Sequence, residues 1–284
     1  MRNRRLITML ALVLLSLTSY SGVARAVDDA ATLPEPMPLP DAPDRLEALQ
    51  NIRKEMPGKG NMPFDLRNDA QKQAALSYGA RGGLAAREYQ IRKELEMRAG
   101  YLDKVFDFRQ LLIPAPSGLL IEPPVISEQQ KAMIISSHGR EAAVADRIYN
   151  ITVQAKIVGT PHSWRNYLER DWSKVTPPPD LLRPANAEER KKWKAWVAQG
   201  WKSGLAQADE IFQDDLNELT SDYQGMIRYR MLLAQGMVSP PYATQHDRGV
   251  TGGGKMMRIG DREVLISGMP ELVTGTESWQ PASR

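Results

Sequence analysis

The sequence predicts a predominantly α-helical α+β protein in which long helices carry small antiparallel β elements. Two long segments, residues 64–113 and 187–238, contain no proline. In the second, apolar or small residues recur about every 3.6 residues, the period of a straight α-helix. Between Tyr149 and Ile157 the pattern changes to strict alternation of apolar and polar residues, which is typical of a half-buried strand.

The first 26 residues have the layout of a secretory signal. A basic start from Arg2 to Arg5 precedes twelve apolar-rich residues from Leu6 to Leu17, and Ala24-Arg25-Ala26 supplies a small-x-small cleavage site. Twelve residues are too few to span a bilayer. We therefore expect an exported, periplasmic protein that is cut after Ala26 and has no transmembrane helix.

Removal of this signal changes the charge balance of the chain. The full sequence carries a net charge of +3, but the remaining residues hold 33 basic against 34 acidic side chains, a net charge of −1. A protein near neutrality has no general electrostatic footprint for nucleic acid, so we expect no direct nucleic-acid binding. The sequence has no cysteine, which excludes both disulfides and a lipid-modified cysteine.

The expected domain organisation is a linker, a single domain and a tail. Residues 27–43 include five prolines in eleven positions from Leu33 to Pro43, a composition that favours an extended polyproline tether. A single α+β domain is expected over residues 44–272. Residues 273–284 are expected to form a C-terminal tail.

The first long helical region is predicted at residues 69–108. Asp65 or Asn68 is suited to cap a helix that begins near Asp69. Gly79 and Gly83 stand four residues apart, a spacing that usually indicates a closely crossing helix. Gly100 leaves open whether the region is one helix or two.

Short β elements are predicted next, at residues 111–121 and 132–158. The segments 111–113 and 119–121 are expected to be extended, and 133–136 is expected to pair with the strand 146–158 across the turn 137–140. Ser163 is expected to cap a short helix.

The second long helix is predicted at residues 187–238. At about 1.5 Å per residue it is roughly 75 Å long, which exceeds the diameter of a small domain. Its apolar stripe must be covered, either by the rest of this chain or by a partner protein. Trp193, Trp196 and Trp201 lie beside four lysines in its first third. This cluster suits a nucleic-acid stacking strip or a protein interface, and the net charge of −1 favours the interface.

A C-terminal hairpin is predicted over residues 256–266. Gly260-Asp261 stands between two extended runs and places glycine at the first central position of a two-residue turn. The preceding segment, Gly249–Met256, is one residue short of a phosphate-binding loop, because Met256 replaces the required hydroxyl. A prolyl loop before it and a hairpin after it also differ from the strand and helix that such a loop needs.

No motif in the sequence supports catalysis or metal binding. The three histidines, His138, His162 and His246, do not stand at metal-ligand spacing from one another. We therefore predict no catalytic residue, no metal, no cofactor and no enzymatic activity.

Several segments together resemble one family. The resemblance is strongest from Gly225 to Leu272, GMIRYRMLLAQGMVSPPYATQHDRGVTGGGKMMRIGDREVLISGMPEL, which is similar to the C-terminal signature of DotC, the type IVB secretion component whose counterpart in IncI-type conjugation is TraI. Further matching segments are GARGGLAAR (79–87), YLDKVFDF (101–108), EPPVI (122–126), SWRNYLERDW (163–172) and GWKSGLAQAD (200–209).

The resemblance implies a structural subunit of an outer-membrane core complex, assembled with DotD-like and DotH-like partners. The family's well-known members are lipoproteins, whereas Leu15 to Gly22 holds no acceptor cysteine, so outer-membrane attachment is expected through partners. The alternative is a periplasmic ligand-binding protein or hydrolase without a recognised motif. For the partner interface we predict Trp193, Trp196, Trp201, Gly252, Gly253, Gly254, Met256, Met257, Ile259, Val264 and Ile266.

Overall fold

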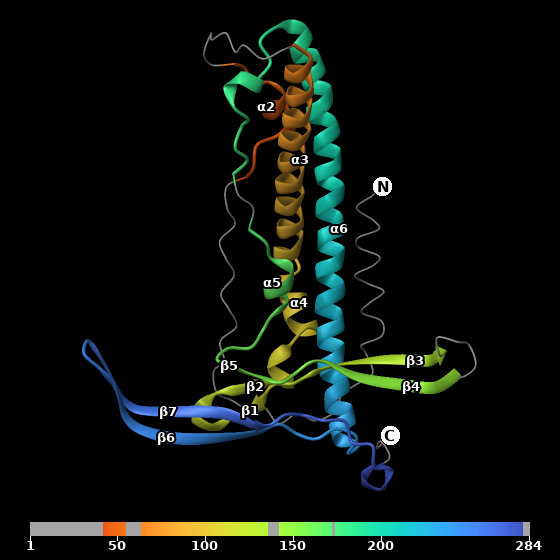
Figure 1. Cartoon of the computed structure of the whole chain (residues 1–284), viewed down its shortest axis with the longest axis vertical. Helices are drawn as coiled ribbons and strands as arrows, with labels where there is room; N and C mark the ends of the chain where they lie inside the picture. Colours follow the sequence, from red (N-terminus) through yellow and green to blue (C-terminus); the bar gives the residue numbers. More distant parts are fainter. Residues whose placement is uncertain (1–41, 55–63, 136–141, 172–173, 281–284) are drawn as a thin grey trace. The chain divides into compact units, whose positions relative to one another are not determined.

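The computed structural model describes residues 42–54, 64–135, 142–171 and 174–280 (Figure 1). The predicted signal peptide and nearly all of the predicted linker lie outside these residues. The chain divides into two compact units. We call residues 42–100 and 165–219 the helical unit, and residues 101–164 and 220–280 the sheet unit. The single domain predicted over residues 44–272 stays a prediction.

The helical unit is built on two parallel helices. Helix α3 (Phe64–Glu96) lies beside the first part of α6 (Ala187–Ala234), and both run in the same direction (Figure 1). Arg67 pairs with Glu189 and Arg87 pairs with Asp209, near the two ends of their contact. The partners are 122 residues apart in both pairs, as expected for parallel helices. The helix predicted to start near Asp69 starts earlier, at Phe64. The elements α2 (Leu46–Gln50), α5 (Trp164–Leu168) and η3 (Asp180–Leu182) complete this part of the chain.

Glycines set the closeness of this helix pair. A Cβ added at Gly79 or Gly83 of α3 would meet backbone carbonyl oxygens of α6, and one added at Gly200 or Gly204 would meet those of α3. The four glycines thus let the two backbones touch directly. The close crossing predicted from the spacing of Gly79 and Gly83 is confirmed.

The core of the helical unit forms where α2 meets this pair. Leu49, Tyr78 and Trp193 are buried together with Val197. The indole N–H of Trp193 donates to the carbonyl of Leu49 at 3.2 Å, so the largest side chain in this core is also hydrogen-bonded.

The sheet unit contains three small antiparallel sheets. Strands β1 (Ile113–Pro114), β2 (Leu120–Glu122) and β5 (Lys156–Val158) form one sheet in the order β1-β2-β5. Strand β3 (Val125–Ile135) pairs with β4 (Ala142–Val153), and β6 (Tyr242–Gly253) pairs with β7 (Met256–Gly268). The predicted pairing of residues 133–136 with a strand at 146–158 is only partly right, because residues 133–135 pair with 142–144 and the predicted strand is divided between β4 and β5. Ser136 and the predicted turn lie outside the described residues.

Short helices and the end of α6 complete this unit. Helix α4 (Ala99–Val105) is separate from α3, which answers the question that Gly100 left open. The 3₁₀ turns are η1 (Phe108–Leu111), η2 (Pro116–Gly118) and η4 (Thr276–Ser278). Helix α6 ends at Ala234 rather than at residue 238, because Gly236 adopts φ +69° and the N–H of Met237 donates to the carbonyl of Leu232. This is the Schellman arrangement.

The C-terminal part of α6 carries the core of the sheet unit. Ile126 of β3 packs against Tyr229 and Leu232 of α6, and Val238 closes this cluster. The aromatic rings of Phe106 and Phe108 contact Tyr223 edge-on. The predicted fold class, mainly helical α+β with small antiparallel sheets, is confirmed.

The predicted C-terminal hairpin is wrong in its turn and its partner strand. Residues 256–266 lie in one strand, β7, and the turn is Gly254-Lys255 rather than Gly260-Asp261. The new turn also places glycine first, with φ +60° at Gly254, so it obeys the same rule as the predicted one. Gly260 has φ +71° but stands at a β-bulge within β7.

Candidate partner interface

Strands β6 and β7 form a long arm, residues 242–268, anchored at its base. Beside the base, the N–H of Ser239 donates to the carbonyl of Glu271 and the N–H of Val273 donates to that of Met237, both at 2.9 Å. The hydroxyl of Ser117 donates to Oε1 of Gln245 at 2.7 Å. These bonds hold the first part of the arm to the sheet unit.

Two bulges divide the arm into a proximal and a distal half. The pairing register shifts once around Arg248 on β6 and once around Gly260 on β7, and the two shifts compensate each other. Gly249 and Gly260 have φ +67° and +71°, backbone angles that a side chain rarely adopts. Bulges increase local bend and twist, and Figure 1 shows the arm curving toward its tip.

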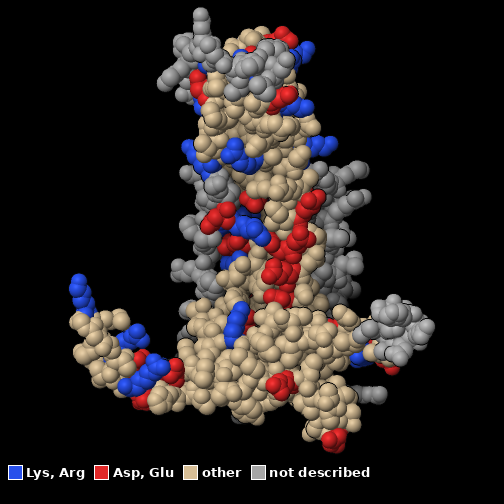
Figure 2. Space-filling view, in the orientation of Figure 1, with Lys and Arg blue, Asp and Glu red and all other residues tan. Residues whose placement is uncertain are grey.

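The distal half, residues 248–260, exposes large apolar side chains. Ile259 is 77% exposed and Met257 is 68% exposed, although neither carries a polar group. The segment has basic residues at Arg248, Lys255 and Arg258 and no acidic residue. Figure 2 shows basic side chains at the end of this arm. Such a patch usually marks a binding surface.

Both faces of the distal half carry exposed apolar groups. Val250 pairs with Ile259, and both lie on the same face of the arm as Met257. Met256 lies on the opposite face, because successive side chains of a strand alternate between faces. The outer edges of β6 and β7 pair with no other strand in the described part of the chain. Open edges and uncovered apolar faces make this arm the best candidate for a contact surface.

The predicted hairpin residues fall at different depths on the arm. Gly252 and Gly253 are exposed next to the turn that contains Gly254. Met256, Met257 and Ile259 are exposed in the distal half, whereas Val264 and Ile266 lie half-buried in the proximal half. The sequence thus predicted the region but with the wrong strand pairing.

The three tryptophans predicted at the interface differ in their exposure. Trp193 is 0% exposed in the core of the helical unit, and Trp196 and Trp201 pack partly buried against the same core. Trp193 lies four residues before Val197, so it continues the apolar stripe of α6 by one turn. That spacing was a signal for burial that the neighbouring lysines obscured.

The glycine-rich segment 249–256 does not form a phosphate-binding loop. It spans the end of β6 and the turn of the arm, where no helix follows. A phosphate loop needs a helix N-terminus at that point. The interpretation of these glycines as turn and bulge residues agrees with their positive φ angles.

A buried carboxylate that the sequence did not suggest lies in the small sheet. Glu122 of β2 contacts Nδ1 of His162 and lies 3.1 Å from Nζ of Lys156. Burial raises the pKa of Glu122, but the contacts with His162 and Lys156 outweigh it and leave this pKa below its usual value. The group ties β2, β5 and the following loop together. No periodicity relates residues so far apart in sequence.

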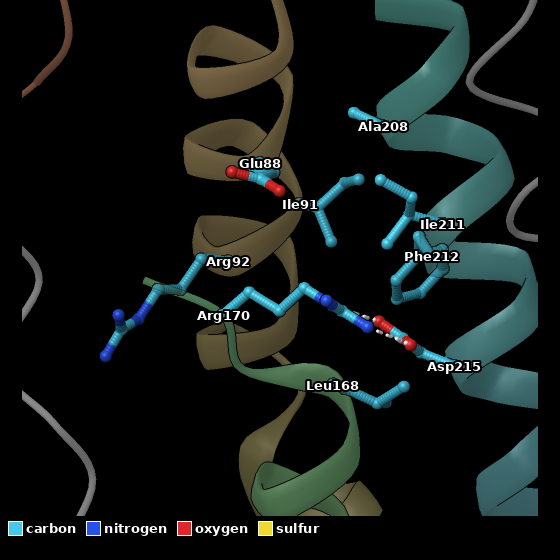
Figure 3. A pocket seen from close by; sticks show the side chains of 9 residues that line it. All are labelled: Glu88, Ile91, Arg92, Leu168, Arg170, Ala208, Ile211, Phe212 and Asp215. Atoms are coloured by element: carbon cyan, nitrogen blue, oxygen red, sulfur yellow. Dashed lines mark hydrogen bonds and ion pairs between the residues drawn. The ribbon is translucent and has the colours of Figure 1, made fainter. Parts of the chain in front are cut away.

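A small cavity in the helical unit is lined by Arg170 and Asp215 (Figure 3). Its volume is about 20 Å³, room for about one water molecule. Arg170 forms two hydrogen bonds of 2.6 Å with Asp215, and Figure 3 shows this pair bridging the segment after α5 to α6. Burial raises the pKa of the neighbouring Glu88. The geometry of this cavity fits a structural ion pair.

Among the described residues, no group of three or more histidine, cysteine or carboxylate side chains is placed to hold a metal ion. In the same residues, no helix is both long enough and apolar enough to cross a membrane.

Comparison with family models identifies the chain's relatives. The family described as type IV secretory system, conjugal DNA-protein transfer, matches residues 65–281. The chain belongs to this family. The match to this conjugal-transfer family covers the helical unit from residue 65 on and the whole sheet unit with its β6–β7 arm, and it confirms the predicted resemblance to the TraI and DotC secretion proteins. No curated protein gives a significant sequence match to the chain.

Proposed function

We propose that this protein is a structural subunit of the outer-membrane core complex of a type IVB secretion or conjugative transfer system. It is exported to the periplasm and assembles there with DotD-like and DotH-like subunits, through which it associates with the outer membrane. It acts as a scaffold and carries out no catalysis.

The β6–β7 arm is the single observation that carries this proposal. A two-stranded sheet is marginally stable in water, and this one leaves both edges open and large apolar side chains exposed. A partner that adds a strand to one edge would form the missing backbone hydrogen bonds there and would bury these apolar side chains. Gly252, Gly253, Gly254, Met256, Met257 and Ile259 form the proposed contact region, with Val264 and Ile266 supporting it from the proximal half.

Trp196 and Trp201 are weaker members of the proposed interface. Both are partly exposed, so a partner can reach their edges. Trp193 is not retained, because its side chain is fully buried.

The test is recovery of partner subunits by tagged variants. Ile259→Asp places a charge in the proposed contact, and we expect it to lower recovery of the DotH-like or DotD-like subunit at least about tenfold, since interface centres tolerate unpaired charges poorly. Met97→Asp is the matched control, because Met97 is also 77% exposed but lies outside the arm. It is expected to leave recovery unchanged.

Equal recovery of both partner subunits by the two variants would contradict the proposed contact region. Recovery lost in both variants would instead indicate a general effect of added negative charge. A tagged wild-type protein that captures neither subunit from envelope extracts would contradict the proposed function itself.

A further inference from the structure

A second feature, independent of the arm, is a hollow on the helical unit where α2 meets the start of α6. Its volume is about 360 Å³. We call it the basic hollow; its lining residues are Gln50, Asn51, Arg53, Ala187, Arg190, Lys191 and Lys194.

Buried contacts fix the two walls of the basic hollow. Behind it, Leu49 and Trp193 are both fully buried, and the indole N–H of Trp193 donates to the Leu49 carbonyl. At its side, Nε2 of Gln50 donates to the carbonyl of Lys194 at 3.2 Å. The end of α2 is therefore tied to the first turns of α6 at two adjacent positions. The backbone that carries the lining side chains is preorganised by this core.

The lining of the basic hollow contains four cations and no carboxylate. In the described part of the chain, Arg53, Arg190, Lys191 and Lys194 form no ion pair. The guanidinium of Arg190 donates to the carbonyl of Ala185, at 3.5 Å. Several other arginines of the helical unit do meet carboxylates. The paired examples are Arg67 with Glu189, Arg87 with Asp209 and Arg170 with Asp215.

Two acidic side chains at the start of α6, close in sequence to Arg190 and Lys191, are engaged elsewhere. Glu189 pairs with Arg67 and accepts from the N–H of Ala185, and Glu188 lies 3.6 Å from Lys192. The start of α6 is itself capped, because Asn186 Oδ1 accepts from the N–H of Glu189 at 2.8 Å. The positive charge of the hollow therefore belongs to side chains, and neither of these two carboxylates pairs with a residue that lines it.

We propose that the basic hollow binds a phosphate-bearing anion, either a free phosphate compound or the phosphate of a lipid headgroup. Two guanidinium groups offer paired donors that match phosphate oxygens, and two ammonium groups add charge without fixed geometry. At about 30 Å³ per water, the volume accommodates a phosphate together with an attached group. The side-chain amides of Gln50 and Asn51 supply neutral donors beside it.

The experiment titrates the purified protein with pyrophosphate by calorimetry. In parallel, it measures co-sedimentation with vesicles of mixed phosphatidylglycerol and phosphatidylcholine, and with vesicles of phosphatidylcholine alone. The double variant Arg190→Ala/Lys194→Ala removes two of the four cations, and Lys191→Glu reverses a third whose side chain is exposed. Lys202→Ala is the matched control, because Lys202 is an exposed lysine of α6 outside the hollow.

We expect saturable binding that weakens at least about tenfold in the double variant and in Lys191→Glu, and by less than about twofold in Lys202→Ala, since hydrogen bonds to charged groups dominate such sites. Binding of pyrophosphate assigns a free phosphate compound, and binding only to phosphatidylglycerol vesicles assigns a headgroup. No binding in either arm, or binding that the hollow variants leave unchanged, would overturn the proposal. A single-stranded oligonucleotide is titrated in the same way, and binding to it without binding to pyrophosphate or to vesicles would also overturn the proposal.

Discussion

The α3–α6 helix pair and the β6–β7 arm use the same residue, glycine, for opposite purposes. In the helix pair, Gly83 and Gly204 are placed where a methyl group would strike the neighbouring backbone. In the arm, Gly253, Gly254 and Gly260 have nothing within 4 Å of an added Cβ, and two of these three have positive φ. Glycine therefore marks close packing in one region and backbone conformation in the other. The helix pair packs its glycines against the neighbouring backbone, whereas the arm leaves Met257 and Ile259 exposed.

The largest expected change in the free energy of unfolding comes from a substitution in the core of the helical unit. Trp193→Ala removes a fully buried indole and its hydrogen bond to Leu49, and it is expected to lower the free energy of unfolding by about 3–5 kcal/mol. Urea denaturation followed by circular dichroism measures this. Trp279→Ala, at a tryptophan that is 40% exposed, serves as the control and should cost much less. Equal losses at both positions would remove the distinction between core and surface aromatics.

The next effect tests the close packing of the helix pair. Gly204→Ala places a Cβ against the carbonyl of Ala80, and the helices must separate to admit it. Overpacking of this kind costs about 1–3 kcal/mol, which outweighs the gain of up to about 1 kcal/mol in helix propensity. Thermal and urea unfolding measure the net loss.

Gly100→Ala is the matched control for this change. Gly100 lies in α4 with nothing within 4 Å of an added Cβ, so only the propensity gain applies. The variant is expected to be more stable than the wild type by about 0.5–1 kcal/mol. A stabilised Gly204→Ala variant would show that the two helices do not touch at this point.

A third effect concerns the small sheet of the unit that carries the arm. Contacts with His162 and Lys156 outweigh burial and hold the pKa of Glu122 below its usual value. A carboxyl whose pKa is lowered in the folded state stabilises the fold above its unfolded pKa of about 4.3, and this contribution is lost as the pH falls through the lowered value. We expect Glu122→Gln to cost about 1–3 kcal/mol at pH 7, because a buried charge-assisted contact is removed.

The pH dependence separates this contact from ordinary packing. The wild type should lose stability between about pH 5 and pH 2, and the difference between wild type and Glu122→Gln should shrink over the same range. Urea unfolding at several pH values measures both. A difference that stays constant with pH would show that Glu122 contributes only through packing.

The helices could be predicted from the sequence because their signals are periodic. The 3.6-residue stripe through Val197 and Leu216 predicted α6. The alternation from Tyr149 to Ile157 predicted the end of β4 and most of β5, but as one strand rather than two. The arm was harder, because β6 contains His246-Asp247-Arg248 and three glycines and shows no alternation. Gly254-Lys255 and Gly260-Asp261 satisfy the same turn rule, so local chemistry did not distinguish them; the pairing with β6 did.

Two features of the structure could not be predicted from the sequence. The basic hollow combines Arg53 with Arg190 across more than a hundred residues, and Glu122 meets His162 through the pairing of short strands. Neither pair of residues belongs to a repeating pattern in the sequence. The tryptophan error was different in kind, because the helical period did place Trp193 on the stripe of Val197. The adjacent lysines suggested an exposed face and obscured the helical period.

The smallest expected effect on stability is the most informative about the arm. Ile259→Asp is expected to change the free energy of unfolding by less than about 0.5 kcal/mol, because a 77% exposed side chain makes few contacts to lose. Ile126→Asp is the matched control: it is the same substitution in a strand, at a fully buried position against Tyr229 and Leu232, and it should cost more than about 3 kcal/mol. If both variants were equally destabilised, the distal arm would be packed within the isolated protein and would leave no free surface for a partner. A near-neutral Ile259→Asp that also fails to recover the partner subunits would separate binding from folding at this one side chain.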